Sequence, residues 1–254
     1  MLERIDLNSD LGEGFGPWEM GDDAALLDLV SSANIACGGH ASDPDTMYAT
    51  LALARDRGVV VGAHPGYADP QGFGRRIIPM APDAIGRMIA AQIGALQGVA
   101  ALADVTPRYV KLHGALANLA ADDLPVAKAV VQAVAAFRGL AVLAISGTVL
   151  EQVAQAAGLP VYSEVFADRA YLANGRLAPR TRPDAVLHDA DAAAQRLLRF
   201  LDSGLMPSVD GPAVRLQAHS VCVHGDSPDA VRMARHLRAQ LQAQGVTIAP
   251  FLAG

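Results

Sequence analysis

The sequence has few cysteines, few lysines and no long hydrophobic run. Cys37 and Cys222 form no C-x-x-C pair, so we expect no disulfide framework and two small buried hydrophobic side chains. The amino-terminal residues are charged where a signal peptide carries its apolar segment, and no uncharged apolar run reaches the length of a membrane span. We therefore expect a cytoplasmic protein without a membrane partner.

Sequence motifs of several enzyme classes are also missing. Neither lysine ends a G-x-x-x-x-G-K-[S/T] loop, which excludes a P-loop nucleotide site. The chain has no G-x-S-x-G elbow, no H-E-x-x-H helix and no G-x-G-x-x-G turn between a strand and a helix, which weighs against serine-triad hydrolases, zincins and dinucleotide dehydrogenases. The formal net charge of −6 provides no basic surface, so we expect no nucleic acid partner.

The 254 residues, 52% of them hydrophobic, are enough for one large core, and we expect a single domain over residues 1–254. Short apolar runs alternate with longer helical patterns, which predicts parallel strands wrapped by helices. The expected strands are 5–8, 33–37, 59–63, 109–113, 141–145, 161–166, 220–224 and 246–251. The expected helices are 43–57, 82–103, 124–137, 148–157, 190–201 and 227–244.

Two hairpins are predicted to interrupt this alternation. One covers 171–177 and has a type I′ turn at Asn174-Gly175, and the other surrounds Asp210-Gly211. The strands themselves are nearly all apolar, which is typical of a sheet that is covered on both faces. This pattern suits a closed barrel or a doubly wound open sheet, and periodicity alone leaves both open.

Histidines and carboxylates follow five of the expected strands at the point where each strand ends. In chain order these residues are Asp10, Glu13, His40, His64, His113, His224 and Asp226. In a parallel barrel such strand ends open on one face, and in an open sheet they gather at one edge. A single histidine of this kind is more often an ordinary turn residue, but four in equivalent positions predict a shared site.

Two expected strands carry further polar side chains. Alternation along a strand puts Asn8 and Asp10 on one face, and it puts Lys111 and His113 on one face as well. Buried carboxylates suit general acid–base catalysis, and an ammonium beside an imidazole suits a developing oxyanion or a carboxylate. The alternatives are a loop network that only holds the neighbouring glycines in shape and a lysine on an exposed strand face.

Two loops beyond the strands add charged residues. The stretch GFGRR at 72–76 places Arg75 and Arg76 side by side, and arginine binds carboxylate or phosphate with two parallel hydrogen bonds. Asp168 and Arg169 follow the sixth strand, where they contribute to the site or pair with each other. Histidine and carboxylate ligands at strand ends could also hold Zn²⁺ or another divalent ion, and the sequence leaves the ligand set open.

Seven motifs run through nearly the whole chain in a fixed order. They are IDLNSDLGEGFG at 5–16, NIACGGHASDP at 34–44, GAHPGY at 62–67, GFGRR at 72–76, VKLHGAL at 110–116, EVFADR at 164–169 and VHGD at 223–226. In these motifs the chain resembles the LamB/YcsF family of 5-oxoprolinase A subunits. It departs from the family at Ser9, where cysteine is usual, and at Gly39 and Leu112, where the departures affect local loop shape.

The resemblance implies an irregular seven-stranded (β/α) barrel like that of the glycoside hydrolase/deacetylase superfamily. It also implies ATP-dependent opening of the lactam ring of 5-oxoproline (pyroglutamate) to L-glutamate. The implied partners are two further subunits that look like halves of an allophanate-hydrolase-type protein. Because this chain has no P-loop, we expect the cosubstrate ATP to be bound with those partners.

The resemblance also implies roles for individual residues. On this hypothesis Asp10 or His40 activates water, and His64, Lys111 and His113 hold developing charge. The expected substrate-binding residues are Asn8, Glu13, Arg75, Arg76, Asp168, Arg169, His224 and Asp226. Two other functions remain open, namely a metal-dependent deacetylase or amidohydrolase that acts alone and a non-catalytic binding subunit.

Overall fold

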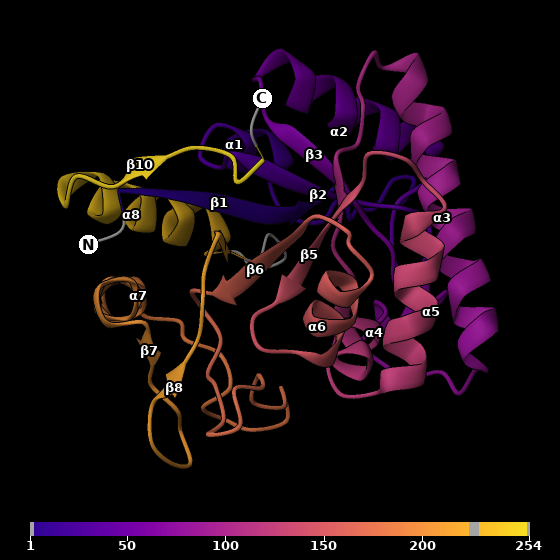
Figure 1. Cartoon of the computed structure of the whole chain (residues 1–254). Helices are drawn as coiled ribbons and strands as arrows, with labels where there is room; N and C mark the ends of the chain where they lie inside the picture. Colours follow the sequence, from indigo (N-terminus) through magenta and orange to yellow (C-terminus); the bar gives the residue numbers. More distant parts are fainter. Residues whose placement is uncertain (1–2, 224–228, 253–254) are drawn as a thin grey trace.

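The structure is a computed structural model that describes residues 3–223 and 229–252. Seven parallel strands form a closed barrel in which the last strand pairs with the first (Figure 1). In barrel order they are β1 (Arg4–Leu11), β2 (Ser32–Ala36), β3 (Val60–His64), β4 (Tyr109–Val110), β5 (Ala141–Ile145), β6 (Val161–Phe166) and β9 (Ser220–Cys222). The closure confirms the predicted irregular seven-stranded (β/α) barrel and decides against an open sheet.

Strand β1 pairs with three neighbours in turn, which makes the barrel irregular. Its first residues pair with β10 (Thr247–Ile248), its middle with β9, and its end with β2. Beyond β10 the chain places Phe251 against Tyr109 and Tyr162, with ring centroids 5.0 and 4.8 Å apart. These aromatic rings close the barrel near the amino-terminal ends of β4 and β6.

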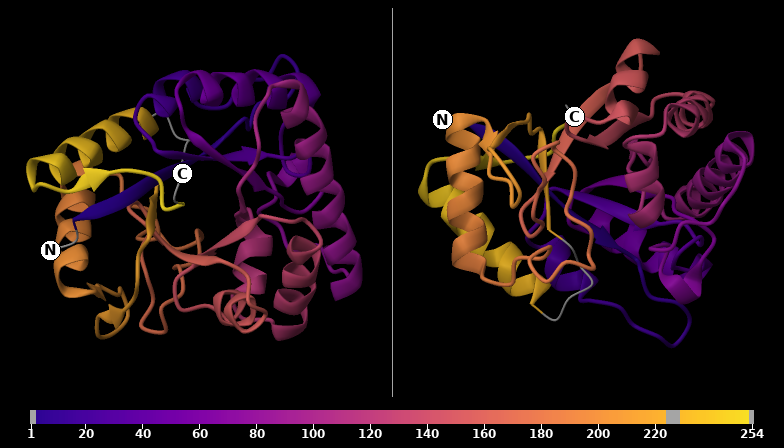
Figure 2. Two further views of the ribbon diagram at one scale, coloured as in Figure 1. Left: turned by 45° about the horizontal axis from the view of Figure 1, so that its top comes forward. Right: turned by 90° about the horizontal axis from the view of Figure 1, so that it is seen from below.

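Helices surround the barrel on its outer side (Figure 2). They are α1 (Asp23–Leu27), α2 (Pro44–Asp56), α3 (Pro82–Leu102), α4 (Gly114–Ala120), α5 (Leu124–Ala135), α6 (Val149–Ala156), α7 (Ala190–Ser203) and α8 (Ala230–Ala243). The six predicted helices are confirmed within a few residues, whereas the short α1 and α4 were not predicted. At the start of α2 the Asp43 side chain accepts hydrogen bonds from the N–H groups of Asp45 and Thr46, as expected of a helix cap. The expected start of α8 at Ser227-Pro228 lies outside the described residues.

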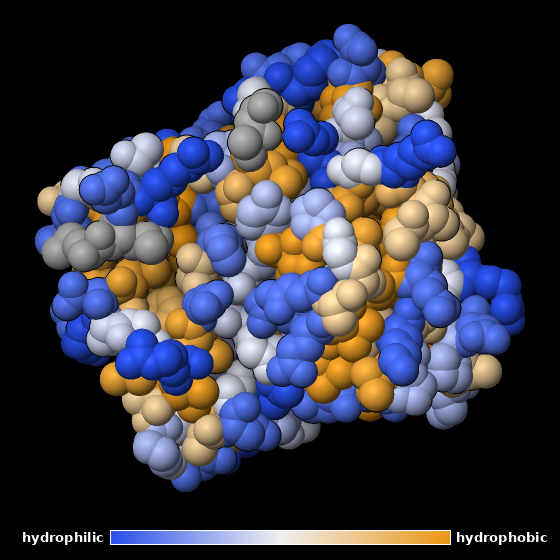
Figure 3. Space-filling view, in the orientation of Figure 1, coloured by the Kyte–Doolittle hydropathy of each residue, from blue (hydrophilic) through white to orange (hydrophobic). Residues whose placement is uncertain are grey.

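Helix α3 is long and apolar enough, by length and composition, to cross a membrane. In the structure, however, Ile85, Ile89 and Ile93 are fully buried in the main hydrophobic core, and α3 packs on α2 and α5. The helix therefore acts as a core helix of the barrel. Apolar residues also occur among hydrophilic ones on the face in Figure 3, as is normal for folded proteins.

Both predicted hairpins are present, but one turn differs from the prediction. Strands β7 (Leu205–Met206) and β8 (Val214–Arg215) pair in antiparallel fashion, which confirms the hairpin around Asp210-Gly211. At 171–177 the prediction of a type I′ turn is wrong, because Gly175 has a positive φ of 80° and Asn174 does not. The Asn174 side chain instead accepts a hydrogen bond from the Arg176 N–H at 3.0 Å, which stabilises a three-residue loop.

Candidate active site

Strand β1 places the polar side chains of Asp6, Asn8 and Asp10 in the barrel interior, and Asp6 is the first of them along the strand. One carboxylate oxygen of Asp6 accepts hydrogen bonds of 2.7 Å from the hydroxyls of both Ser31 and Ser32, and the other oxygen accepts one from Ser220. Burial raises the pKa of Asp6 to about 6, although these hydroxyl donors lower it in part. Neutral donors thus occupy both oxygens of Asp6.

Asn8 lies two residues further along β1 and connects three other strands. Its amide N–H groups donate to Glu164 at 2.9 Å and to Ser220 at 2.6 Å. Its carbonyl oxygen accepts from Asn34 at 2.7 Å and from the Lys111 ammonium at 3.1 Å. Protein partners therefore surround the side chain that the sequence suggested for substrate binding, and these contacts orient Glu164 and Lys111.

Lys111 is buried just beyond β4 between two carboxylates. Its ammonium lies 2.9 Å from Asp10 and 2.9 Å from Glu164, and 3.1 Å from the sulfur of Cys222. Burial alone would lower the pKa of Lys111, but attraction by the two carboxylates raises it well above 10.5. For the carboxylate of Glu164 the effect of burial has the opposite sign. Burial raises the pKa of Glu164, and the charge of Lys111 lowers it in part.

Glu164 was not among the predicted site residues. The sequence did contain a signal for it, because a carboxylate in the middle of a mostly apolar expected strand needs a partner once the strand is buried. Cys222, which contacts the same ammonium, is a free buried cysteine as predicted, and burial raises its pKa well above 9.

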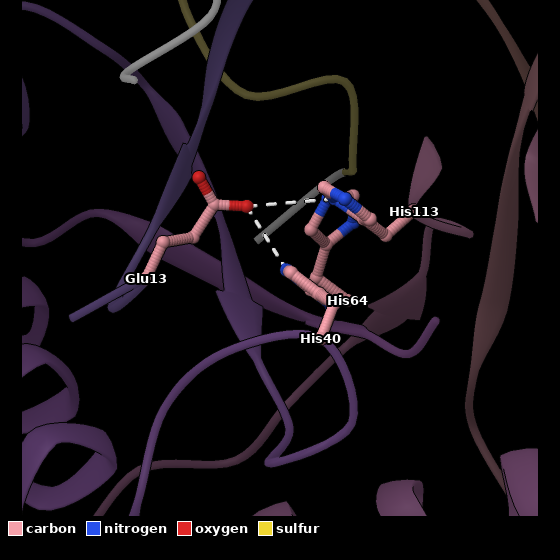
Figure 4. Close-up of side chains that lie close together, drawn as sticks. All are labelled: Glu13, His40, His64 and His113. Atoms are coloured by element: carbon pink, nitrogen blue, oxygen red, sulfur yellow. Dashed lines mark hydrogen bonds and ion pairs between the residues drawn. The ribbon is translucent and has the colours of Figure 1, made fainter. Parts of the chain in front are cut away.

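Four buried side chains from four consecutive strand ends converge above Lys111 (Figure 4). They are Glu13 after β1, His40 after β2, His64 at the end of β3 and His113 at the start of α4. One oxygen of Glu13 lies 3.0 Å from Nε2 of His40 and 3.4 Å from Nδ1 of His113. Nε2 of His64 lies 3.0 Å from Nδ1 of His113, and the rings of His40 and His113 stack with centroids 3.5 Å apart. We refer to these four residues as the histidine cluster.

Two backbone carbonyls determine where the protons of this cluster lie. Nδ1 of His64 is 2.8 Å from the carbonyl oxygen of Lys111, and Nε2 of His113 is 2.8 Å from that of Phe73. A carbonyl oxygen only accepts hydrogen bonds, so each of these ring nitrogens carries a hydrogen. Burial lowers the pKa of His40 and of His113 well below 6.5, and the neighbouring histidines lower it further. In these tautomers the neutral rings of His64 and His113 direct their unprotonated nitrogens at each other.

A glycine allows the loop after β3 to approach the cluster. Gly74 has a positive φ of 61°, and a Cβ at this position would lie 2.7 Å from Cβ of His40 and 2.8 Å from Cδ2 of His113. Any larger residue would therefore push the two stacked rings apart. The GFGRR motif is thus shaped by close packing on the cluster as well as by its arginines.

A cavity of about 480 Å³ opens beside the cluster at the carboxyl-terminal ends of the strands. Among its lining residues are four of the five predicted catalytic residues, namely Asp10, His64, Lys111 and His113. His40 is absent from the lining, because it lies behind His113 with Glu13. Asp10 is held at the inner end, with one oxygen 2.8 Å from the Asn34 amide and the other 3.3 Å from Nε2 of His64.

The structure separates the two adjacent arginines of the GFGRR motif. Arg75 lines the cavity, and its guanidinium lies 5.0 Å from the ring centroid of Phe73. Arg76 forms an ion pair with Asp69 instead, with Nε 3.0 Å from a carboxylate oxygen, and it does not line the cavity. Of the two candidates for anion binding, the geometry thus brings Arg75 to the site.

The remaining predicted residues have different locations. Arg169 lines the cavity, but its guanidinium donates to the carbonyl oxygens of Ala178 and Ala185, and burial lowers its pKa to about 10. Asp168 is half-buried outside the lining. His224 and Asp226 lie outside the described residues.

Two arginines that the sequence did not single out, Arg176 and Arg180, also line the cavity. Arg176 lies in the hairpin at 171–177 and Arg180 in the loop that follows it, where no periodic pattern could have indicated that they line a cavity. Together with Lys111, Arg75 and Arg169 they give the cavity an excess of basic groups near Asp10. This arrangement suits a small anionic ligand whose reacting atoms reach the inner end.

Comparisons with known proteins match this chain over nearly its whole length. The model of the LamB/YcsF family matches residues 5–253. An A subunit of 5-oxoprolinase from Rhodopseudomonas palustris is 50% identical over 250 residues, and the match covers 98% of each chain. An A subunit of 5-oxoprolinase from Pseudomonas syringae pv. tomato is 49% identical over 251 residues, again with 98% of each chain covered. The crystal structure of a lactam utilization protein from Thermus thermophilus is similar with a TM-score of 0.90 and 40% identity, over 97% of this chain and 99% of that one.

Proposed function

The chain belongs to the LamB/YcsF family, and on that premise we propose that it is the subunit of an ATP-dependent 5-oxoprolinase in which the lactam ring of 5-oxoproline is opened to L-glutamate. Relatives that are named A subunits of 5-oxoprolinase support this proposal, because about half of the aligned residues are identical to those of this chain. The observation that carries it is the position of Asp10, which lies between Lys111 and His64 at the inner end of an arginine-lined cavity.

The reaction needs activation because a five-membered lactam is an unstrained amide. Transfer of the terminal phosphoryl group of ATP to the lactam oxygen makes the ring carbon electrophilic. Water then attacks that carbon, the bond from the carbon to the ring nitrogen breaks, and the nitrogen takes up a proton, which leaves the phosphoryl group on the new carboxyl group as an acyl phosphate. A second water cleaves this acyl phosphate to the free carboxylate and phosphate. The net reaction adds one water across the lactam and one across ATP, which gives glutamate, ADP and phosphate.

Two residues at the inner end of the cavity fit the steps at the ring carbon. Asp10 is the base that we assign to the attacking water, and its geometry is fixed by Lys111 and Asn34. The ammonium of Lys111 provides positive charge where the tetrahedral carbon develops an oxyanion. Because both groups are buried, their electrostatic effect is stronger than it would be in water.

The arginines fit the anionic groups of the reactants. Arg75 reaches the cavity from the GFGRR loop, and Arg180 reaches it from the loop before α7. Guanidinium groups bind carboxylates and phosphates with two parallel hydrogen bonds. We assign these side chains to the carboxylate of 5-oxoproline and to the transferred phosphoryl group.

The proposal includes partner subunits. The word subunit in the relatives' names supports a complex, and we propose that the two other subunits resemble halves of an allophanate-hydrolase-type protein and that ATP is bound with them. The sequence has no P-loop of its own, which agrees with this division of work. A cytoplasmic location, where ATP is available and thiols such as those of Cys37 and Cys222 stay reduced, suits the proposal.

One observation favours a second function. The histidine cluster has the composition of a metal site, and a metal-dependent amide hydrolase that acts alone would need neither ATP nor any partner. The two functions differ in what the isolated chain can do.

The test is to measure glutamate and ADP formation from 5-oxoproline and ATP by the chain alone and by its mixture with the two candidate partner subunits. The proposal predicts both products in the mixture, in equal amounts, and neither with the chain alone. Hydrolysis of 5-oxoproline by the chain alone without ATP would replace the proposal with the second function. A folded mixture that forms no glutamate would contradict the proposal.

A further inference from the structure

We propose that Glu13, His40, His64 and His113 bind one divalent cation of the zinc class at the inner wall of the cavity. Each residue offers one ligand atom, and the four ligand atoms all lie within 4.8 Å of one another. The side chains come from four successive strand ends of a closed barrel, so the fold itself fixes their approach. The site goes beyond the proposed function, since the binding of the ion requires neither ATP nor lactam.

The distances in the cluster agree with those around a bound ion. Nitrogen and oxygen ligands lie about 2.0–2.1 Å from Zn²⁺, so neighbouring ligand atoms of a tetrahedral site are roughly 3.3 Å apart. The observed distances are 3.0 Å from Glu13 to His40, 3.4 Å from Glu13 to His113 and 3.0 Å from His64 to His113. All four ligand atoms lie within 4.8 Å of one another, so the pairs that are furthest apart need to close by up to about 1.5 Å around an ion.

The hydrogen bonds of two histidines are those of metal ligands. Histidines that bind metals almost always donate their second ring N–H to a carboxylate, a backbone carbonyl or water, which fixes the tautomer. His64 and His113 do this through the carbonyl oxygens of Lys111 and Phe73. Their other nitrogens then present lone pairs to each other at 3.0 Å, an arrangement that only a shared proton or a cation stabilises.

The geometry distinguishes between these two possibilities. A shared proton bridges only His64 and His113, whereas a metal ion can reach all four ligand atoms, which lie within 4.8 Å of one another. A divalent cation brings more charge and binds to the neutral imidazoles directly. The carboxylate of Glu13 compensates part of that charge within the same cluster.

The donor set selects the kind of cation. Three imidazoles and one carboxylate suit Zn²⁺ and its neighbours in the first transition series, whereas Mg²⁺ and Ca²⁺ prefer oxygen ligands. His40 differs from the other two histidines, because its Nδ1 is buried without a hydrogen-bond partner and no carbonyl fixes its tautomer. Its Nε2 can therefore donate to Glu13 when no metal is bound, and we expect His40 to contribute least to metal affinity.

The proposed ion would give His64 and His113 a means to stabilise negative charge. Both line the cavity, but as neutral imidazoles they already donate their N–H groups to backbone carbonyls and have none left for an oxyanion. A cation bound to their other nitrogens supplies positive charge at that wall. This role in turnover rests on the proposed function, while metal binding itself does not.

Metal content and cobalt spectra test the site without any assay of turnover. The tag-free protein is stripped with a chelator, dialysed against Zn²⁺ and analysed for bound metal, and a second portion is loaded with Co²⁺. We expect one equivalent of Zn²⁺ and visible absorption bands of a low-symmetry Co²⁺ site with nitrogen ligands. The spectrum of the unaltered protein requires no substitution, so it keeps the proposal testable even if variants fold poorly.

Three variants sharpen the measurement. His113→Gln and Glu13→Gln should weaken Zn²⁺ binding by at least about 100-fold, since even the loss of a residue that only orients a ligand costs about 10- to 100-fold. His188→Gln, at an exposed histidine, is the matched control and should bind like the unaltered protein. Circular dichroism identifies any variant that has lost its fold.

Two results would overturn the inference: substoichiometric metal with no cobalt bands, or stoichiometric binding that folded His113→Gln and Glu13→Gln leave unchanged. Metal bound as expected in a reconstituted enzyme that forms no glutamate would instead contradict the proposed function and leave the site in place.

Discussion

Asp6 and Asp10 lie on the same strand and point into the same barrel, yet their surroundings are opposite in kind. Both carboxylates are buried. Asp6 is enclosed by three serine hydroxyls near the end of the barrel that Phe251 closes. Asp10 contacts the ammonium of Lys111 and faces a cavity.

These two carboxylates show how one strand can stabilise a fold and carry a site. Neutral hydroxyls satisfy the hydrogen-bonding capacity of Asp6 but bring no compensating charge, so its pKa rises to about 6. Around Asp10 the protein instead places ionised groups and imidazoles whose lone pairs face each other. A group of polar side chains whose hydrogen bonds are all satisfied by the protein, as around Asp6, supports the fold. A group of charged side chains next to a cavity, as around Asp10, can interact with a ligand.

The largest expected effect is at the ammonium of Lys111. Together with Asp10 and Glu164 it forms a group of buried charges that we call the Asp10 layer. Lys111→Met leaves Asp10 and Glu164 buried without their common counterion, and we expect a loss of about 3–5 kcal/mol in the free energy of unfolding together with loss of turnover. Denaturant unfolding measures the first effect. The matched control is the other lysine of the chain, since Lys128 on α5 is exposed and Lys128→Met should change stability by less than about 0.5 kcal/mol. Equal effects of the two substitutions would contradict the role of Lys111 as the counterion of Asp10 and Glu164.

The next largest effect is expected at the histidine cluster, where a substitution should lower turnover without unfolding the protein. His113→Ala should lower turnover of the reconstituted enzyme by about 10²–10³-fold, because it removes a ligand of the proposed cation that supplies positive charge at that wall of the cavity. Its circular dichroism spectrum should match that of the unaltered protein. His188→Ala, at an exposed position, serves as the control. Near-normal turnover of His113→Ala would remove this residue from the mechanism.

Asp6 and the three serine hydroxyls around it, which we call the Asp6 layer, should affect the pH dependence of stability rather than turnover. In the folded state Asp6 binds its proton more tightly than an exposed carboxyl with the usual pKa of 3.8, since its own pKa is about 6. Its contribution to stability is therefore fully present below pH 3.8 and is lost as the pH rises to about 6, by at most about 3 kcal/mol. Asp6→Asn has no such titration. We expect the unfolding free energy of the unaltered protein, relative to Asp6→Asn, to fall between about pH 4 and pH 7, and a constant difference would show that Asp6 does not titrate in this range.

The smallest effect distinguishes the two arginines of the GFGRR loop. Arg75→Ala should raise the KM for 5-oxoproline or ATP roughly tenfold or more, as expected for loss of a hydrogen bond to a charged group. Arg76→Ala removes an ion pair of a side chain that is 63% exposed, so it should change stability by less than about 1 kcal/mol and leave KM unchanged. A larger rise in KM for Arg76→Ala than for Arg75→Ala would reverse the assignment.

The alternation of strands and helices predicted a parallel α/β fold and a shared site for the histidines, whereas the choice of a closed barrel came from the resemblance to the LamB/YcsF family. Strands alternate with helices, and histidines follow the strands, so a parallel barrel brings His40, His64 and His113 to one end. The sequence could not show that His40 lies behind His113, because the order of stacked rings depends on how Gly74 packs against them.

Other features depend on individual contacts that no periodic pattern in the sequence indicates. The choice between Arg75 and Arg76 follows from the ion pair of Arg76 with Asp69, which is formed by the local shape of the loop. The proton positions of His64 and His113 follow from backbone carbonyls, which carry no signal in the amino-acid sequence. Periodicity describes single elements, and these contacts arise only when the elements pack.

The two aspartates of β1, compared in the same assay, provide the most direct test of where the lactam is opened. Asp6→Asn and Asp10→Asn are each combined with the two partner subunits, and the kcat for glutamate formation is measured at neutral pH. We predict that Asp10→Asn loses about 10²–10⁴-fold in kcat, as expected for removal of a general base, while Asp6→Asn stays close to the unaltered enzyme. A normal rate for folded Asp10→Asn, or equal losses for both folded variants, would contradict the claim that the lactam is opened at the Asp10 layer.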